Sequence, residues 1–546
     1  MKWKAATTRS FTTLHSWVGL LAGFALFVAF YAGAITVFQQ PIQAWAAPQP
    51  TAMGSLAVAQ QLLDGVLAQH PEAREHVGMT FPGYELAEPT AYWQDRHGTW
   101  LYATPGQPAG STRRPGASLP ELVNELHYTL GLPIAGTWLM GLVSLLYGIA
   151  LVSGLVIHLP RLAKNLFALR PGPNLKRFWQ DAHNVIGVLS LPFHVVFAVT
   201  GALLCLLAVL MLALNPLVYG GKLMANVGQA MDTAPIVQKA DVARPLGSLA
   251  SWSARSIEVA RDRGVANFVP GYLKLANAGD AHAVVEITGT SPRALGAGVV
   301  ALDATSGAVL ATQLPGSRDA NHAALAAVYA LHYGDYGNIA VQWLYFLLGL
   351  GGAFLFYSGN LLWIETRRRR GQATQGRSSI VMARATVGIC IGVCVAVSVA
   401  FVAAQLLPAL GWNAADAGER WACFLAWAAC VAWAAWRPPL RAAQELLWLA
   451  TIVTALVPVA HGLATGWWFW RSAAAGYGVL AAIDLAALAM AVAFATLARA
   501  ATHRGRSGVP DNVWALPRAD AYCESRHPGF DRPGQPEGTG SPLSRG

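Results

Sequence analysis

The sequence predicts a mainly α-helical, polytopic membrane protein: a four-helix core with two inserted α+β segments, followed by four additional C-terminal helices. Of the 546 residues, 54% are hydrophobic and only 12% are charged, and the mean hydropathy is +0.40; both are typical of membrane proteins. Long apolar runs alternate with polar segments. The basic residues gather in short segments beside these runs, as in cytoplasmic loops, so the net charge of +10 does not indicate nucleic-acid binding.

The first part of the chain is expected to contain two membrane helices around a polar domain. Residues 1–39 comprise a short basic N-terminus and the first transmembrane helix, because their apolar run is too long for a signal-peptide core. Residues 40–132 are polar and rich in Pro and Gly, which indicates a small extracytoplasmic α+β domain. A second helix at 133–158 leads into a basic cytoplasmic loop at 159–182.

The same order of segments then repeats. A third helix is predicted at 183–214, a second extracytoplasmic α+β domain at 215–337, a fourth helix at 338–365 and a second basic loop at 366–384. Both polar segments end in a Leu-His-Tyr triplet, and both outward-running helices begin near a histidine. These similarities indicate an internal repeat of about 170 to 200 residues.

Residues 385–498 hold four further apolar runs, which we expect to be transmembrane helices five to eight. The last segment, 499–546, is basic and then rich in Pro and Gly, as in a disordered tail. Eight helices would place both termini in the cytoplasm, with every strongly basic loop on that same side.

The cysteines predict neither a disulfide-stabilised domain nor covalently attached haem. None of the six lies in the large polar segments, so disulfides are not expected to stabilise an extracytoplasmic domain. The motif C-x-x-C-H is absent from the sequence, which excludes c-type haem attachment on motif grounds. Any haem would therefore be held by axial ligands alone.

Four histidines sort into two pairs by their predicted depth. His15 and His183 lie at the cytoplasmic ends of the first and third helices, whereas His127 and His332 lie just before the second and fourth helices at the opposite face. A four-helix core can hold one bis-histidine b-type haem near each surface. Each histidine alone is as readily explained as an interfacial residue, but two topologically matched pairs favour two haems.

His194 has no obvious place in this pairing. It follows His183 by eleven residues, so on one helix the two would share nearly the same face about 16 Å apart along the axis. An ionisable residue inside a membrane usually has a function. His194 could replace His127 or His332 as a ligand, hold a third haem, or bond to a propionate. His461 lies in the second half of the chain and has no evident partner there.

The sequence carries no signature of a bound nucleotide. Its glycine runs lie in or beside membrane sequence and do not follow a strand of a βαβ unit, and it contains no Walker A motif. If the protein moves electrons, the donor is expected to be external: a quinol, a flavoprotein or a soluble reductase.

Four pieces of the sequence carry a resemblance to a known family. They are L-H-S-W-V-G-L at 14–20, D-A-H-N-V-I-G-V at 181–188, T-G at 200–201 and L-H-Y-G-D-Y-G-N at 331–338. In this order they resemble the PepSY-associated transmembrane family of iron-regulated or iron-uptake inner-membrane proteins, which includes ferric-siderophore reductases. The resemblance covers about residues 1–370. It implies inserted PepSY-like domains and b-type haem, with His15, His127, His183 and His332 on the family's histidine motifs.

Together these features predict a di-haem b-type reductase in the lipid bilayer of a bacterial inner membrane. It would pass electrons from the cytoplasmic side or the quinone pool to a periplasmic ferric siderophore or other ferric chelate. Two alternatives remain open. The helices could form a transporter or permease in which histidines relay protons or bind metal, or the PepSY-like segments could bind or sense a periplasmic partner.

Overall fold

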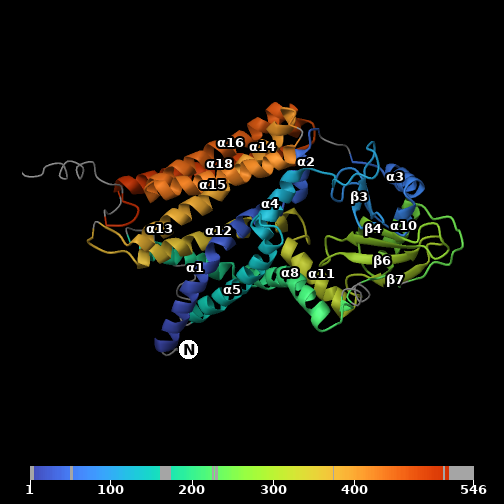
Figure 1. Cartoon of the computed structure of the whole chain (residues 1–546), viewed down its shortest axis with the longest axis horizontal. Helices are drawn as coiled ribbons and strands as arrows, with labels where there is room; N and C mark the ends of the chain where they lie inside the picture. The colour runs from blue at the N-terminus through green and yellow to red at the C-terminus, as the bar shows by residue number, and fades with distance from the viewer. Residues whose placement is uncertain are drawn as a thin grey trace, which may run out of the picture.

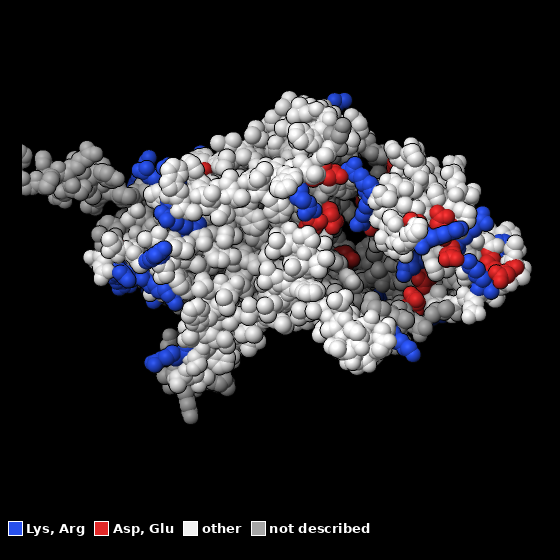
Figure 2. All heavy atoms as spheres, viewed as in Figure 1, with Lys and Arg blue, Asp and Glu red and all other residues white. Residues whose placement is uncertain are grey.

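The protein is elongated, with long helices gathered at one end and a β-sheet at the other (Figure 1). We call the end of the helices nearest the sheet the sheet end. The opposite end is called the basic end, because the arginines at 367–370 directly follow the end of a long helix there. Figure 2 shows Lys and Arg side chains gathered at the basic end on the face in view. This computed structural model describes residues 5–49, 53–159, 174–223, 227, 232–235, 237–372, 374–412, 414–507 and 511–515.

The N-terminal core consists of long apolar helices that pack side by side. Helix α1 packs against both α12 and α5, α5 packs against α8, and α7 packs against α12. Small residues permit the close approach of α1 and α12: a Cβ at Gly349 would lie 2.9 Å from the Cβ of Ala34. The helices are α1 (Ala5–Thr36), α5 (Ala135–His158), α7 (Leu175–Leu189), α8 (Leu191–Leu217) and α12 (Ile339–Thr366).

The single straight helix predicted over 183–214 is wrong. Helices α7 and α8 meet at Ser190 with a bend of 71°. Pro192 lies in the first turn of α8, where it has no N–H to donate and its ring would clash with the carbonyl four residues earlier in a continuous helix. His183 and His194 therefore lie on different helices, and their predicted alignment on one helix face does not hold.

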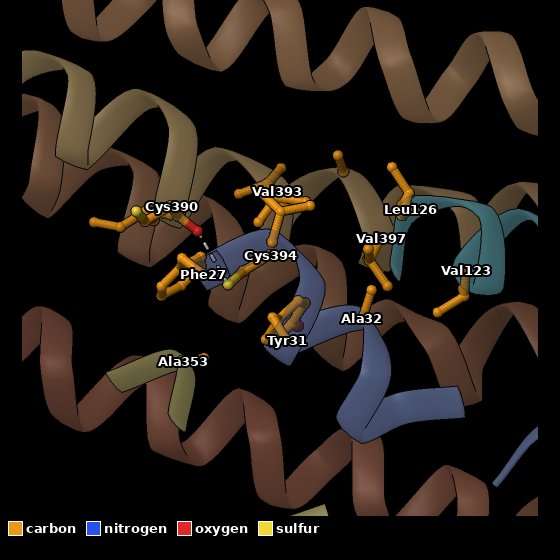
Figure 3. Close-up of a cluster of buried hydrophobic side chains, with 14 of the residues drawn as sticks. Phe27, Tyr31, Ala32, Val123, Leu126, Ala353, Cys390, Val393, Cys394 and Val397 are labelled. Carbon is orange, nitrogen blue, oxygen red and sulfur yellow. Dashed lines mark hydrogen bonds between the residues drawn. The ribbon is translucent and has the colours of Figure 1, made fainter. Parts of the chain in front are cut away.

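The C-terminal helices form a second bundle beside this core. Helix α14 packs against α15 and α16, and α16 packs against α18. Figure 3 shows part of the apolar contact between the bundle and the core, where Phe27 and Tyr31 of α1 lie near Cys390 and Cys394. The bundle comprises α13 (Arg377–Ala385), a π-helical turn (Thr386–Ile391), α14 (Gly392–Ala409), α15 (Ala415–Trp436), α16 (Pro439–Thr465), α17 (Phe469–Ala474) and α18 (Gly478–Ser507).

Six helices among the described residues are long and apolar enough to cross a membrane, or up to seven if the bent pair α7–α8 counts as one span. The prediction of a mainly helical membrane protein is confirmed. The expected number of spans was eight, which is more than the six or seven found among the described residues. One of the four helices expected within 385–498 is α15, which is not among the six or seven. Its first turns carry three charged residues and its sequence contains four tryptophans, and both lower its hydropathy.

The two polar segments share one antiparallel sheet. Its seven strands follow the order β3-β2-β1-β4-β5-β6-β7, and β1 pairs with β4, which places Val77 opposite Leu275 and Met79 opposite Leu273. Helices α3 (Leu56–Gln69) and α10 (Leu249–Asp262) pack on each other and against the sheet. The strands are β1 (His76–Thr80), β2 (Thr90–Gln94), β3 (Trp100–Ala103), β4 (Val269–Ala276), β5 (Val284–Thr290), β6 (Gly298–Asp303) and β7 (Val309–Gln313).

This shared sheet corrects the expectation of two separate domains at 40–132 and 215–337. Divided there, β1 and β4 would each present an unpaired strand edge, which folded proteins usually cover. Their pairing removes both edges, and the side chains of the two segments form one apolar cluster that includes Leu63, Trp93 and Trp252.

Three shorter helices connect the sheet to the membrane helices. They are α2 (Gln39–Ala46), α4 (Ser118–Thr129) and α11 (Ala320–Tyr333). Helix α4 packs against α1 and carries buried apolar side chains at helical spacing, namely Leu119, Leu122, Val123 and Leu126. Helix α11 packs against α8. These contacts place the histidines near the C-terminal ends of α4 and α11 against the core.

Part of the segment predicted to be a disordered tail, 499–546, is ordered. Its first residues continue α18, and Val513 and Trp514 pack against a cluster that contains Leu361 and Met382. Arg368 forms an ion pair with Asp511. Residues 508–510 and 516–546 of the tail lie outside the described residues, as does most of the predicted basic loop at 159–182.

Candidate functional site

The structure brings four of the predicted histidines together as two pairs. The ring centroids of His15 on α1 and His183 on α7 lie 6.2 Å apart with their planes at 78°; we call these residues the basic-end pair. The ring centroids of His127 on α4 and His332 on α11 lie 5.9 Å apart with their planes at 43°; these form the sheet-end pair. In each pair, the two side chains come from helices of different halves of the repeat.

Each imidazole of the basic-end pair is held through its Nδ1 atom. His15 Nδ1 donates to the Ala150 carbonyl at 2.9 Å, and His183 Nδ1 donates to the Leu355 carbonyl at 3.1 Å. A carbonyl oxygen can only accept, so Nδ1 carries the proton in both rings. The Nε2 atoms of this pair therefore keep their lone pairs.

The rings of the sheet-end pair also carry a proton on Nδ1, but they donate it to different acceptors. His127 Nδ1 donates to the Ala29 carbonyl at 2.7 Å. His332 Nδ1 lies 2.8 Å from Thr200 Oγ1, and Thr200 gives its own hydroxyl proton to the Val196 carbonyl at 2.7 Å. Thr200 must then accept from His332, so Nδ1 carries a proton in all four rings, and each ring in its neutral form keeps the lone pair of Nε2.

This arrangement fits axial ligation of haem iron. Two imidazoles that bind one metal from opposite sides, each through a nitrogen at about 2 Å, have ring centroids about 6 Å apart. Metal-binding imidazoles also usually donate their other N–H to a carbonyl or another acceptor. Both pairs meet these conditions. In the part of the chain that the structure describes, no three His, Cys, Asp or Glu side chains converge as a metal site, but haem iron needs only two protein ligands.

Glycines lie against the paired rings. A Cβ at Gly154 would lie 3.1 Å from Cε1 of His15, and one at Gly359 would lie 3.3 Å from Cε1 of His183. A Cβ at Gly33 would lie 2.6 Å from Nδ1 of His127. A side chain at Gly33 would displace that imidazole, so this glycine is required by the close approach of α4 to α1.

A cavity of about 1290 Å³ reaches the sheet-end pair, and His127 and His332 both line it. Figure 2 shows a hollow between the helical part and the sheet, bordered by acidic and basic side chains. The polar residues that line the cavity include Tyr84, Glu85, Arg113, Arg114, Glu121, Tyr128, Asp335, Asp416 and Arg420. His15 and His183 are not among its lining residues.

His194 is buried, and both of its ring nitrogens have hydrogen-bond partners. Nε2 lies 2.9 Å from Ser190 Oγ, and Nδ1 lies 2.5 Å from the Tyr147 hydroxyl. Ser190 gives its own proton to the Ile186 carbonyl, so Nε2–H donates to Ser190 and Tyr147 donates to Nδ1. Neither nitrogen is free for a metal in this arrangement.

Aromatic rings connect His194 to the sheet-end pair. Phe193 and Phe197 have ring centroids 4.3 Å apart, and Phe197 lies 5.1 Å from His332. Phe30 of α1 contacts His194, Phe193 and Phe197. His194 thus belongs to a buried aromatic cluster rather than to either pair.

His461, which has no evident partner in the sequence, has one in the structure. Its Nδ1 lies 2.9 Å from Asp484 Oδ2, and Trp45 Nε1 donates to Asp484 Oδ1 at 2.8 Å. The three residues are at most 1% exposed and join α2 to the C-terminal bundle. Sequence reasoning missed Asp484, although an acidic residue inside an apolar run is a signal for a buried partner.

The acceptors of the paired imidazoles were also missed. Backbone carbonyls, such as those of Ala29, Ala150 and Leu355, leave no trace in a sequence. Thr200 and Tyr147 could have been found, because both are polar residues inside apolar runs, where a buried hydroxyl is expected to have a partner.

The fold and these pairs define a multi-pass helical membrane protein whose core presents paired histidines at two levels. Residues 12–366 match the family described as the PepSY-associated TM region. The match covers well over half of the chain, so the protein belongs to this family, and the family identified from the sequence is confirmed. An uncharacterized protein of Pseudomonas aeruginosa is 27% identical over 304 residues, which are 53% of this chain and 73% of that protein.

Proposed function

We propose that the protein is a b-type di-haem oxidoreductase of a bacterial inner membrane that reduces a ferric siderophore or another ferric chelate. One haem would be held by His15 and His183, and the other by His127 and His332. The observation that carries the proposal is the geometry of the two pairs: the ring centroids lie 6.2 and 5.9 Å apart, and every Nδ1 is hydrogen-bonded. Among the described residues, the hydrogen bonds of these four rings all involve Nδ1, which leaves Nε2 for the iron.

The hydrogen-bond acceptors prepare the imidazoles for this role. They fix the tautomer and the orientation of each ring and raise the basicity of Nε2. When bound, haem supplies reversible one-electron chemistry of its iron. All four rings are half-buried, and the sheet-end pair is open to the cavity that it lines.

The cavity supports a substrate site at the sheet end. Its lining includes arginines, carboxylates and tyrosines, such as Arg114, Glu85 and Tyr84, which can bind a polar chelate. A ferric chelate that accepts one electron there becomes ferrous. Hard oxygen donors bind Fe(II) much more weakly than Fe(III), so reduction would release the iron.

The distribution of charge supports the orientation. The basic end carries the arginines at 367–370, and positively charged loops favour the cytoplasmic side. The sheet and the cavity would then face the periplasm, and the basic-end pair would take electrons from a quinol, a flavoprotein or a soluble reductase. The basic-end and sheet-end pairs would thereby serve opposite sides of one bilayer.

Absorbance spectra of the purified full-length protein, oxidised and dithionite-reduced, test the proposal. We expect b-type haem at about two per chain. The double variant His15→Ala/His183→Ala and the double variant His127→Ala/His332→Ala should each lose one haem, while His282→Ala, in the polar segment near β5, should lose none. Wild-type protein without b-type absorbance, or haem content unchanged in both double variants, would contradict the proposal. Transport in vesicles without any reductant would instead favour a permease.

A further inference from the structure

We propose that the C-terminal bundle contributes to the sheet-end site, although it lies beyond the residues that match the family. Helix α15 positions α4 and hence His127, and the first turns of α15 form one wall of the cavity. The part that concerns haem rests on the function proposed above. The part that concerns the placement of His127 does not.

One face of α15 contacts α4 near its start. Ser118 Oγ donates to Glu419 Oε2 at 2.5 Å, and Glu419 is only 4% exposed. Just before α4, Arg113 forms an ion pair with Asp416 at 2.6 Å. A residue in the first turn of α4 and the segment that leads into it are therefore both bound to α15.

The same face of α15 holds the other end of α4. Arg420 forms an ion pair with Glu125 at 2.5 Å, two residues before His127. Gly131 follows α4 with φ +75°, and a Cβ there would overlap the ring of Phe424. Positions 416, 419, 420 and 424 recur at helical spacing, so a single stripe along α15 lies against α4 from start to finish.

Helix α4 needs support of this kind because it is only 12 residues long, and short helices are marginal without tertiary contacts. On one side it packs against α1, where His127 bonds to Ala29. Figure 3 shows Val123 and Leu126 of α4 beside Val397 of α14. The bundle thus covers a side of α4 that the N-terminal core leaves open.

The charged residues of α15 also belong to the cavity. Asp416, Ala417 and Arg420 line it together with Glu121 and Tyr128 of α4. The Arg420–Glu125 and Arg113–Asp416 pairs are partly exposed, so each contributes little to global stability. We therefore infer that their role is to orient α4 and to set the charge of the cavity wall, with Arg420 as the principal positioning residue.

His332 provides an internal reference. It lies on α11, and its Nδ1 is bound to Thr200 of α8. If α15 positions His127 through α4, a change in α15 should alter His127 much more than His332.

The test uses full-length protein with Arg420→Glu, with the charge-swapped double variant Arg420→Glu/Glu125→Arg, and with Phe424→Ala, which weakens the contact without altering charge. The matched control is Arg437→Glu. It breaks the Arg437–Glu445 ion pair, which lies at the opposite end of α15.

Two measurements are made on each variant. The first is the rate at which diethyl pyrocarbonate modifies His127, relative to His332 in the same sample, by peptide mass spectrometry. We expect this ratio to rise about tenfold in Arg420→Glu and Phe424→Ala, which is comparable to the effect of removing a residue that holds a metal ligand in place. In the charge-swapped double variant, the ratio should return towards the wild-type value. The second is a redox titration, in which one of two b-type components should shift and the other should not.

An unchanged modification ratio in both Arg420→Glu and Phe424→Ala would overturn the proposal. So would an equal rise for His127 and His332, or the same rise in Arg437→Glu, because either result would indicate general destabilisation. Absence of b-type absorbance in wild-type protein would contradict the proposed function, whereas the modification ratio would still decide whether α15 positions His127.

Discussion

The two histidine pairs share a geometry but differ in their surroundings. Ring centroids lie 6.2 Å apart in the basic-end pair and 5.9 Å apart in the sheet-end pair, and each Nδ1 donates a hydrogen bond. His127 and His332 line a large cavity with a charged mouth, whereas His15 and His183 do not line it. The same pair of residues thus occurs once beside this cavity and once away from it. Under the proposed function, the first pair would relay electrons and the second would deliver them.

The two pairs also differ in how their rings are fixed. Both rings of the basic-end pair donate to backbone carbonyls, those of Ala150 and Leu355, which no substitution can delete. In the sheet-end pair, His332 depends on the side chain of Thr200. His127 donates to a backbone carbonyl as the basic-end rings do, and those two rings each have a serine hydroxyl as a second contact at 3.3 Å. The comparison can therefore be tested at His332, whose acceptor can be removed by a single substitution.

The largest expected difference concerns access to the two sites. Under the proposed function, His127→Gly would remove one haem ligand beside the cavity, so added imidazole should enter and restore the lost b-type absorbance. In His183→Gly, the same loss should persist because that pair does not line the cavity. The measurement is a titration of each variant with imidazole, followed by absorbance.

Restoration in both variants would show that the two sites are equally accessible and would remove the proposed division of roles. Failure in both would mean that the cavity does not admit a ligand to His332. His282→Gly, at a site remote from both pairs, serves as the control and should not respond to imidazole.

A smaller effect is expected from the acceptor of His332. Thr200→Val keeps the shape of the side chain but leaves His332 Nδ1–H without its acceptor. Loss of such a partner typically lowers metal affinity about tenfold or more. Haem dissociation from the sheet-end site should accelerate accordingly, as measured by transfer to apomyoglobin, while the second haem should be retained.

Thr496→Val is the matched control for Thr200→Val, because Thr496, like Thr200, donates to a carbonyl of its own helix but lies exposed on α18. Equal haem loss in the two variants would indicate a general effect of the substitution. No loss in Thr200→Val would mean that this hydrogen bond does not support the ligand.

The topological repeat explains why the pairs could be predicted from the sequence. Two features fix the depth of each histidine once the basic loops are assigned to one side: the matched triplets around His127 and His332, and the predicted helix starts near His15 and His183. The shared sheet could not be predicted in the same way. The pairing of β1 with β4 joins residues nearly 200 positions apart, and no local pattern records such a register.

The position of His194 shows where the prediction from helical periodicity was wrong. The apolar pattern continues through Ser190 and Pro192, so the sequence reads as one helix. Pro192 is compatible with a first turn as well as with a kink, and only the structure shows the bend of 71°. The partners of His194 and His461 depend on how distant helices pack, which spacing within one helix does not encode.

A more modest effect is expected from the hydrogen bond between Tyr147 and His194, which belong to neither pair. Tyr147→Phe removes the hydroxyl that donates to His194 Nδ1 and leaves a buried acceptor unpaired, which typically costs about 1–3 kcal/mol. We expect the thermal unfolding temperature to fall while both haems remain. Loss of one haem would show that His194 is coupled to a pair after all.

The smallest expected effect distinguishes the two helices that carry the sheet-end histidines. Asp319 caps α11 by accepting from the His322 backbone N–H at 3.0 Å, whereas α4 has no side-chain cap at its start. The hydrogen bond from the His322 backbone, followed by its imidazole, holds the pKa of Asp319 below its ordinary value. The ionised carboxylate therefore stabilises α11 above the ordinary pKa of about 3.9, and this contribution is lost as the pH falls through the lowered pKa. Amide hydrogen exchange, corrected for its intrinsic pH dependence, should show α11 loosening in that acidic window while α4 changes less. In Asp319→Asn the acidic change in α11 should disappear, and an unchanged pH profile in this variant would assign the effect to another group.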